Sequence, residues 1–341
     1  MNGTLSRRNL IVGSAAAATL VCSPHIVRAA GPIRLRVSSS APPDRFGAHY
    51  LWYKPFEEEL TKLAGDRIKL EYFPNGQLGK EADVVNQVKV GAVDMMLTGS
   101  SIWATVVPEF GMLDLGFLFN SYDHCAKALD TGVGDAYNKL LLERSGVTIL
   151  GWTFQVGARS IYTKTPVASV SALKGVKLRV LPNKSFIDTF NVIGATPTPI
   201  PMNEVYMAVQ TGVVDGFEHD PGTVLAYKLF EVTKYCFLTR HIYTPLLAYI
   251  GRSGLAKIPS DLRPLLMQAA AHATSVSRNE VKDVEAEALA DLKAKDIVFT
   301  EAPPADIEDL KRKMADTLYT AYLKQYPATE PLFAQIKAAA S

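Results

Sequence analysis

The chain has 341 residues but only three cysteines and six histidines, and it lacks the short motifs of several common enzyme classes. There is no Cys-x-x-Cys, no His-Glu-x-x-His, no Gly-x-Gly-x-x-Gly and no phosphate-binding loop with its lysine. The histidines do not fall at metal-ligand spacing. We therefore predict that the protein is not an enzyme and needs neither a cofactor nor a metal ion.

An excess of one charge is also missing. Three of the 36 basic residues (Arg7, Arg8 and Arg28) precede a predicted cleavage site, which leaves 33 basic against 34 acidic residues. A mature chain with this balance offers no electrostatic reason to bind nucleic acid or an anionic membrane.

The only extended apolar run lies at the N-terminus, and its dozen or so residues are about two thirds of what a membrane span needs. Arg7 and Arg8, an alanine-rich run through Val21 and a small-residue site ending at Ala29 have the layout of an export signal. The paired arginines favour the twin-arginine route. Val21 is a poor fit to the residue that a lipoprotein signal needs before its cysteine. We expect cleavage near Ala29 and a periplasmic product.

Two cysteines remain after the predicted cut, Cys125 and Cys236. They could pair in an oxidising compartment, or they could be two small apolar residues of the core. The sequence leaves both alternatives open.

About 310 mature residues exceed one comfortable core and suggest two lobes. Apolar strands alternate with helical patterns, which predicts α/β lobes built on parallel sheets. We place residues 31–156 plus 245–284 in lobe I and residues 157–244 plus 285–341 in lobe II. The expected strands are 33–37, 68–73, 93–97, 159–163, 177–181, 213–217 and 246–251, and the expected helices are 50–63, 82–90, 184–193 and 203–211.

The segment from Leu262 to Lys295 has no glycine, and its one proline is in the first turn, where proline is tolerated. It predicts one helix of about 50 Å at 1.5 Å per residue, long enough to span both lobes. A pair of helices broken near residues 275–277 is the alternative.

Arg179 is the first candidate for the functional site. Leu178 and Val180 flank it in period-2 alternation, so its guanidinium is expected on a short strand. A fixed arginine can hold a carboxylate through two parallel hydrogen bonds. A solvated surface turn is the alternative from these residues alone.

In order and separation, four segments resemble the extracytoplasmic solute-binding proteins of tripartite ATP-independent periplasmic (TRAP) transporters. They are Phe73–Gly79, Gly157–Arg159, Leu173–Arg179 and Gly194–Glu218. The resemblance covers nearly all of the mature chain. It implies a two-lobe α/β clamp of the periplasmic binding protein type (type II-like), which closes over an organic acid and delivers it to small and large integral membrane subunits. Such proteins are mostly monomers.

The resemblance also implies roles for individual residues. Arg179 matches the arginine that pairs with the solute carboxylate, and Arg159 matches a further arginine of sialic-acid-binding members. His219 replaces an asparagine of those members, Met202 replaces a phenylalanine, and residues 98–101 lack their acid. These departures argue against sialic acid.

A keto-acid branch of the family uses a glutamine, which Gln155 resembles, and a Glu-Trp pair. Glu218 is followed by His219 instead of tryptophan, which argues against the metal-assisted binding of that branch. Arg159 could contact the carboxylate directly, or it could pair with Glu218. We expect His219 to contact the solute and Asp220 to cap a helix beginning at Pro221.

The remaining site candidates are large apolar side chains that would shape the cleft, although each could equally belong to the core. They are Trp103, Trp152, Phe154, Met202, Phe217 and Tyr243.

A sugar acid or a dicarboxylate is the first expectation for the solute, with an aromatic acid or a keto acid as the alternative. An exported twin-arginine-dependent enzyme is the rival class. A binding protein of an ATP-driven transporter is a nearer rival, against which the long helix and the Lys-x-Arg strand favour a TRAP receptor.

Overall fold

The computed structural model describes residues 31–340. The predicted export signal lies outside this range. In the described part no helix is long and apolar enough to cross a bilayer.

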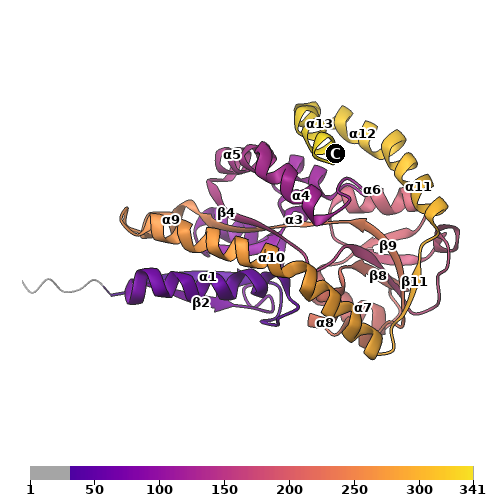
Figure 1. Cartoon of the computed structure of the whole chain (residues 1–341), viewed down its shortest axis with the longest axis horizontal. Helices are drawn as coiled ribbons and strands as arrows, with labels where there is room; N and C mark the ends of the chain where they lie inside the picture. The colour runs from indigo at the N-terminus through magenta and orange to yellow at the C-terminus, as the bar shows by residue number, and fades with distance from the viewer. Residues whose placement is uncertain (1–30, 341) are drawn as a thin grey trace, which may run out of the picture. The chain divides into compact units, whose positions relative to one another are not determined.

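Two sheets form the two lobes of the molecule, as expected (Figure 1). The sheet of the first lobe has the strand order β2 (Ile68–Phe73), β1 (Ile33–Ser39), β3 (Met95–Gly99), β10 (Pro245–Gly251) and β4 (Val147–Phe154). The sheet of the second lobe has the order β11 (Val298–Glu301), β9 (Tyr235–Ile242), β5 (Arg159–Thr163), β8 (Gly216–His219), β6 (Lys177–Val180) and β7 (Thr196–Pro199). The residue boundaries that we assigned to the lobes stay a prediction.

Both sheets are mixed, so the expected parallel pairing is confirmed for some strands, and the antiparallel strands were not predicted. In the first lobe β10 runs antiparallel to β3 and β4, although β1 pairs in parallel with β2 and β3. In the second lobe β5 is antiparallel to both β8 and β9. The chain passes from one sheet to the other between β4 and β5 and returns between β9 and β10. The strand that follows each crossing, β5 or β10, runs antiparallel to both of its neighbours.

The helices of the described residues are α1 (Ala48–Ala64), α2 (Glu81–Val90), α3 (Ser100–Trp103), α4 (Tyr122–Ala128), α5 (Gly134–Ser145), α6 (Lys184–Ile193), α7 (Val205–Gln210), α8 (Pro221–Ala226), α9 (Arg252–Lys257), α10 (Arg263–Ala294), α11 (Pro304–Lys313), α12 (Thr320–Gln325) and α13 (Glu330–Ala339). The helices α1, α2, α6, α7, α8 and α10 begin near their expected residues, whereas the other helices of the described residues were not predicted. A 3-10 segment, η2 (Pro108–Asp114), follows α3.

The long helix α10 is continuous over 32 residues, which confirms the unbroken alternative. It packs along α1 and β4 of the first lobe and against α8 of the second (Figure 1). Leu266 and Ala273 lie in the large core that includes the first lobe, whereas Ala288 and Leu292 lie in the smaller core around α7 and α8. One helix therefore connects the two lobes.

The sequence left open whether the two cysteines form a disulfide or lie unpaired in the core. Cys125 in α4 and Cys236 in β9 are both free and buried. Burial raises the pKa of both thiols, to about 12 for Cys236. Both act as small apolar core residues.

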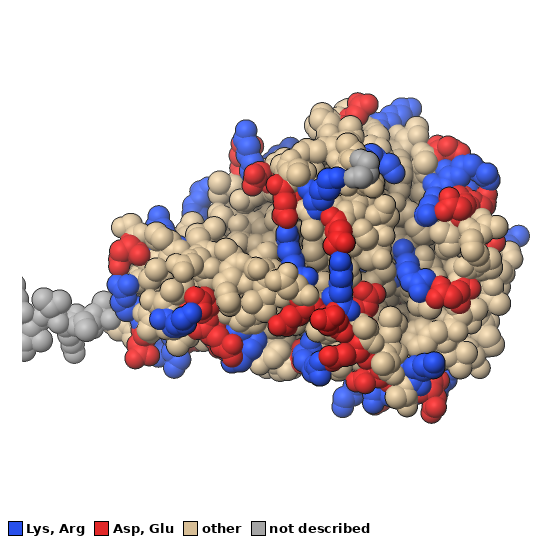
Figure 2. All heavy atoms as spheres, viewed as in Figure 1, with Lys and Arg blue, Asp and Glu red and all other residues tan. Residues whose placement is uncertain are grey.

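The surface carries both charges intermixed. Figure 2 shows acidic and basic side chains side by side over the visible face. Many of them form ion pairs, for example Arg278 with Asp130 and Lys282 with Asp123.

Candidate functional site

Arg179 lies on β6, between the fully buried Leu178 and Val180, as the alternation predicts. Its side chain has no exposed surface. Nε donates a hydrogen bond to the carbonyl oxygen of Ile200 at 2.8 Å, but Nη1 and Nη2 have no hydrogen-bond partner among the described residues. Buried donors of this kind are rarely left unpaired in folded proteins. The two free nitrogens form the planar fork that fits a carboxylate.

The charge of Arg179 is poorly compensated within the protein. Burial is the main cause that lowers its pKa to about 10, and the positive charge of Arg159 acts in the same direction. Glu218 and Glu81 partly oppose this shift. An anion beside the guanidinium would therefore relieve an electrostatic cost that the protein carries alone.

Arg159 on β5 forms a bidentate ion pair with Glu218 on β8. Nε lies 2.6 Å from Oε2 and Nη2 lies 2.7 Å from Oε1, and both side chains are buried. His241 Nε2 lies 3.4 Å from the same carboxylate. Burial opposes the charged form of Glu218, but Arg159 outweighs it and lowers the pKa of Glu218 to about 2. Glu218 therefore neutralises Arg159 and leaves Arg179 as the open cation.

A central cavity lies between the two lobes. Four predicted site residues, Gln155, Arg159, Met202 and His219, are among those that line it. Arg179 is not in the lining, but the charges of two lining residues, Arg159 and Glu81, shift its pKa. The unpaired guanidinium is thus within electrostatic range of the cavity.

Asp220 caps a helix, as expected, whereas the neighbouring His219 lines the central cavity. The Asp220 carboxylate accepts a hydrogen bond from the backbone N–H of Thr223 at 2.9 Å and caps α8, with Pro221 as the first helical residue. His219 Nδ1 lies 2.6 Å from Asp220 Oδ2, and the ring lines the cavity. Burial lowers the pKa of His219 to about 4, so the ring is neutral at pH 7.

Several lining residues were not predicted, and most of them come from the first lobe. His49 follows β1 and donates to or accepts from Ser39 Oγ at 2.8 Å, and burial lowers its pKa to about 4. Glu81 begins α2 and accepts a hydrogen bond from Thr98 Oγ1 at 2.6 Å. In α/β proteins ligands bind beyond the carboxyl ends of strands, and this rule could have indicated the segments after β1 and β3. The remaining unpredicted lining residues are Ser40, Ala41, Gly47, Ala48, Gly99, Ser101, Ile102, Leu181, Thr223, Ala226, Tyr227 and Thr244.

The other large candidates lie outside the cavity lining. Trp103 packs on Phe110 and Tyr249 in the core, and Trp152 packs on Phe110 and Tyr137. Phe154 is also buried in this core. Phe217 stacks on Tyr162 at a centroid distance of 5.3 Å, and the half-buried Tyr243 packs edge-on against Tyr122. Contact of these side chains with a solute stays a prediction.

A neighbouring cavity continues the central one along the boundary between the lobes. We call it the mouth cavity; it shares Ser40, Glu81, Ile102, Leu181 and Met202 with the central cavity. Its lining also includes Lys80, Asp83 and Asn203.

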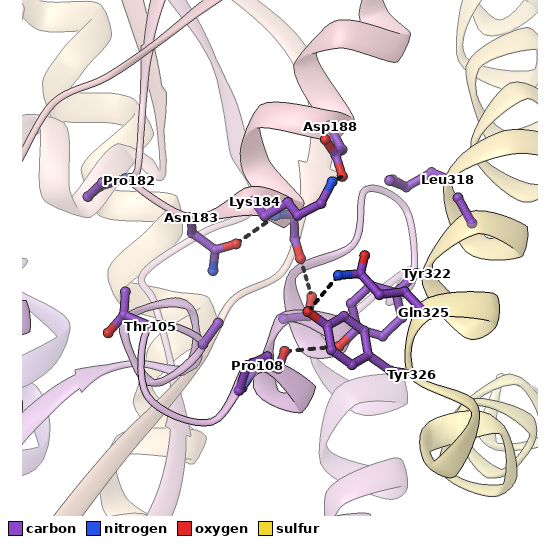
Figure 3. A pocket seen from close by; sticks show the side chains of 14 residues that line it. Thr105, Pro108, Pro182, Asn183, Lys184, Asp188, Leu318, Tyr322, Gln325 and Tyr326 are labelled. Carbon is purple, nitrogen blue, oxygen red and sulfur yellow. Dashed lines mark hydrogen bonds and ion pairs between the residues drawn. The ribbon is translucent and has the colours of Figure 1, made fainter.

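A third cavity lies among η2, the start of α6 and the C-terminal helices (Figure 3). Its polar side chains already have partners. Asn183 Oδ1 accepts from the N–H of Ser185, Tyr322 donates to the carbonyl oxygen of Pro108, and Gln325 donates to Tyr326. In contrast to Arg179, no buried donor here is left without a partner among the described residues, so the central cavity is the better candidate site.

Comparison with known proteins agrees with this geometry. Residues 39–325 match the model of the bacterial extracellular solute-binding protein family 7, DctP. The chain belongs to this family. A solute-binding protein of Roseobacter denitrificans is 32% identical over 252 residues, which are 73% of this chain and 76% of the relative.

Two further matches come from proteins that bind sugar acids. The 2,3-diketo-L-gulonate-binding periplasmic protein of Escherichia coli K12 is 33% identical over 261 residues, 76% of this chain and 77% of the relative. The sugar acid binding protein of Advenella mimigardefordensis, solved in complex with galactonate, superimposes with a TM-score of 0.85 at 26% identity. That match covers 91% of this chain and 99% of the other. The predicted resemblance and the two-lobe fold are confirmed.

Proposed function

We propose that the protein is the periplasmic receptor of a TRAP transporter that captures a sugar acid through Arg179. The two unpartnered nitrogens of this buried guanidinium carry the proposal. A carboxylate that leaves water needs a partner that replaces its hydration, and this fork offers two charge-assisted hydrogen bonds. The relatives that bind diketogulonate and galactonate support a sugar acid over a dicarboxylate or an aromatic acid.

The lining of the central cavity suits a polyhydroxylated chain. Gln155, Tyr227 and neutral His219 offer hydrogen-bond donors and acceptors without a second open cation. Closure of the lobes around the solute would remove it from water, and the receptor would then deliver it to the membrane subunits. Export to the periplasm, with cleavage after Ala29, belongs to the same proposal.

Calorimetric titration of wild type, Arg179→Ala and Arg179→Lys with the best ligand from a thermal-shift panel of organic acids tests the proposal. An anion left buried without its partner costs about 2–5 kcal/mol, so Arg179→Ala should lose about two to four decades of affinity. Lysine should fail as well, because an ammonium cannot reproduce the fork. Unchanged affinity in either variant would refute the role of Arg179.

A further inference from the structure

Glu285 is a half-buried carboxylate of the long helix α10 that the proposed capture of the solute does not use. It lies one turn before Ala288, which belongs to the smaller core around α7 and α8. Burial raises the pKa of Glu285, whereas hydrogen bonding from the Tyr122 hydroxyl and from the N–H of Ala158 opposes this rise. A carboxylate removed from water needs such donors, so the position of Glu285 depends on these two partners.

Tyr122, the first residue of α4, brings its hydroxyl to the same place from the first lobe. This hydroxyl accepts a hydrogen bond from the N–H of Gly157 at 2.5 Å and lies 3.2 Å from the carbonyl oxygen of Gln155. Gly157 is also close to α10, because a Cβ added there would lie 3.2 Å from Glu285 Oε1. Tyr122 and Glu285 therefore both hold residues 155–158, the segment that crosses from β4 to β5.

The return of the chain to the first lobe passes the same two side chains. Tyr243, between β9 and β10, packs edge-on against Tyr122 at a centroid distance of 5.3 Å, and the charge of Glu285 adds to burial in raising the pKa of Tyr243. The N–H of Gln155 donates to the carbonyl oxygen of Thr244 at 3.3 Å and so joins the two crossings. Since α10 itself also connects the lobes, three connections meet at Glu285 and Tyr122.

The lobes are in contact with each other in this structure. The Lys80–Glu204 ion pair and the hydrogen bond from Asn183 Nδ2 to the carbonyl oxygen of Ser101 both join them, so the structure shows the closed arrangement. An interaction shifts the balance between open and closed lobes only if its strength differs between the two. Contacts at the connecting segments meet this condition, because these segments absorb the change when lobes rotate.

We propose that Glu285 is a positioning residue for solute binding, which together with Tyr122 holds the connecting segments in the closed arrangement. The crossing that they hold begins at Gln155 and leads into Arg159, and both of these side chains line the central cavity. Glu285 is not part of that lining, so it acts through the crossing and not on the solute. The proposal rests on capture of a sugar acid with closure of the lobes, and it names a contact that stabilises closure.

Titration of wild type, Glu285→Ala and Glu285→Gln with D-galactonate tests the proposal. Glu285→Ala should weaken binding about tenfold, chiefly through faster dissociation, because the closed state loses a hydrogen bond to a charged group. The glutamine oxygen can still accept a hydrogen bond, so Glu285→Gln should stay within about threefold of wild type. Glu280→Ala, at an exposed position of the same helix, is the matched control and should bind as wild type does.

A double-mutant cycle tests whether the two side chains act together. Tyr122→Phe removes the hydroxyl and should weaken binding about as much as Glu285→Ala, and the double variant should lose little more than either single variant. Melting experiments check that each variant folds, and Tyr122→Phe carries the test if Glu285→Ala does not fold. Losses that add, or wild-type affinity in both single variants, would refute the positioning role.

The distance between the lobes separates this inference from the proposed function. Spin labels on Val90→Cys in α2 and Val213→Cys before β8 report it, because both positions are exposed and Cys125 and Cys236 are buried. Without solute, Glu285→Ala should populate the open lobes more than the labelled wild type does.

If galactonate binding needs Arg179 but Glu285→Ala keeps the wild-type affinity, the positioning role is wrong and the function stands. If wild type does not bind galactonate, or binds it equally well without Arg179, the proposed function fails. Equal solute-free distance distributions would then overturn the closing contact as well, whereas a shift of Glu285→Ala toward open lobes would support it.

Discussion

Lys80 Nζ lies 2.7 Å from Glu204 Oε1, so an ion pair joins the two walls of the mouth cavity. Lys80 directly precedes Glu81 at the start of α2. Glu204 lies two residues after Met202, which lines the mouth cavity. Both side chains of the pair are about half exposed. A second contact between the lobes is buried: Asn183 Nδ2 donates to the carbonyl oxygen of Ser101 at 2.7 Å.

The exposed pair should contribute little to solute affinity. Solvent and salt screen such pairs, so Lys80→Gln should weaken solute binding by less than about fivefold, and the difference should vanish at high salt. Titrations at low and high ionic strength check this expectation. A loss of a hundredfold or more that persists at about 1 M salt would mean that closure depends on this pair.

Acid should destabilise the solute-free protein through its buried histidines. The folded-state pKa values of His49 and His219 are about 4, below the 6.5 of a free imidazole, so the unfolded chain binds more protons between these values. The stabilising contribution is fully present above pH 6.5 and is lost as the pH falls toward 4. Each ring should account for about 2 kcal/mol between pH 7 and pH 5.

Asp114 acts in the opposite direction. Burial raises its pKa from 3.8 to about 7, so its contribution is present at low pH and is lost as the pH rises through this window. Thermal melts from pH 4 to 8 should therefore show a shallower acid loss for His219→Gln and a steeper one for Asp114→Asn. His272→Gln, at an exposed position of α10, is the control. Parallel curves for all four proteins would contradict the assignment.

Much of the fold was predictable because its signals are local. The alternation around Arg179 identified β6, and the glycine-free segment identified α10. Strand direction was not predictable, because the apolar run of β10 looks the same whether it pairs in parallel or antiparallel.

Of the first lobe's share of the candidate site only Gln155 was predicted, and the other predicted lining residues lie in the second lobe. Arg159, Met202 and His219 lie within or beside recognisable motifs, but His49 and Glu81 meet them only after the chain has folded. Aromatic residue type did not separate cavity from core: Trp103 is fully buried among other rings. A hydrophobic side chain is explained equally well by either environment.

The crossing between the lobes depends on a glycine. Gly157 lies between β4 and β5 at φ +112°, and a Cβ there would come within 2.6 Å of Pro221 Cγ. Gly157→Ala should therefore lower the free energy of unfolding by about 1–3 kcal/mol more than Gly175→Ala. Gly175 also has a positive φ, but nothing lies within 4 Å of its added Cβ. Denaturant unfolding of both variants measures the difference, and equal effects would show that Pro221 moves aside.

The two buried arginines should respond oppositely to the same substitution. Arg159→Met leaves Glu218 as an uncompensated buried charge and should destabilise the solute-free protein by about 3–5 kcal/mol. Arg179→Met removes a buried cation whose terminal nitrogens have no partner within residues 31–340, at the cost of one hydrogen bond to Ile200. Its net effect should be a gain of about 1 kcal/mol or more.

Stability gained together with binding lost is expected where a site is held ready for its ligand. Thermal melts of the solute-free variants check the two signs, and titration with the sugar acid checks the loss of binding by Arg179→Met. A melting temperature of Arg179→Met below that of wild type would show that the guanidinium already has a compensating partner in the empty protein.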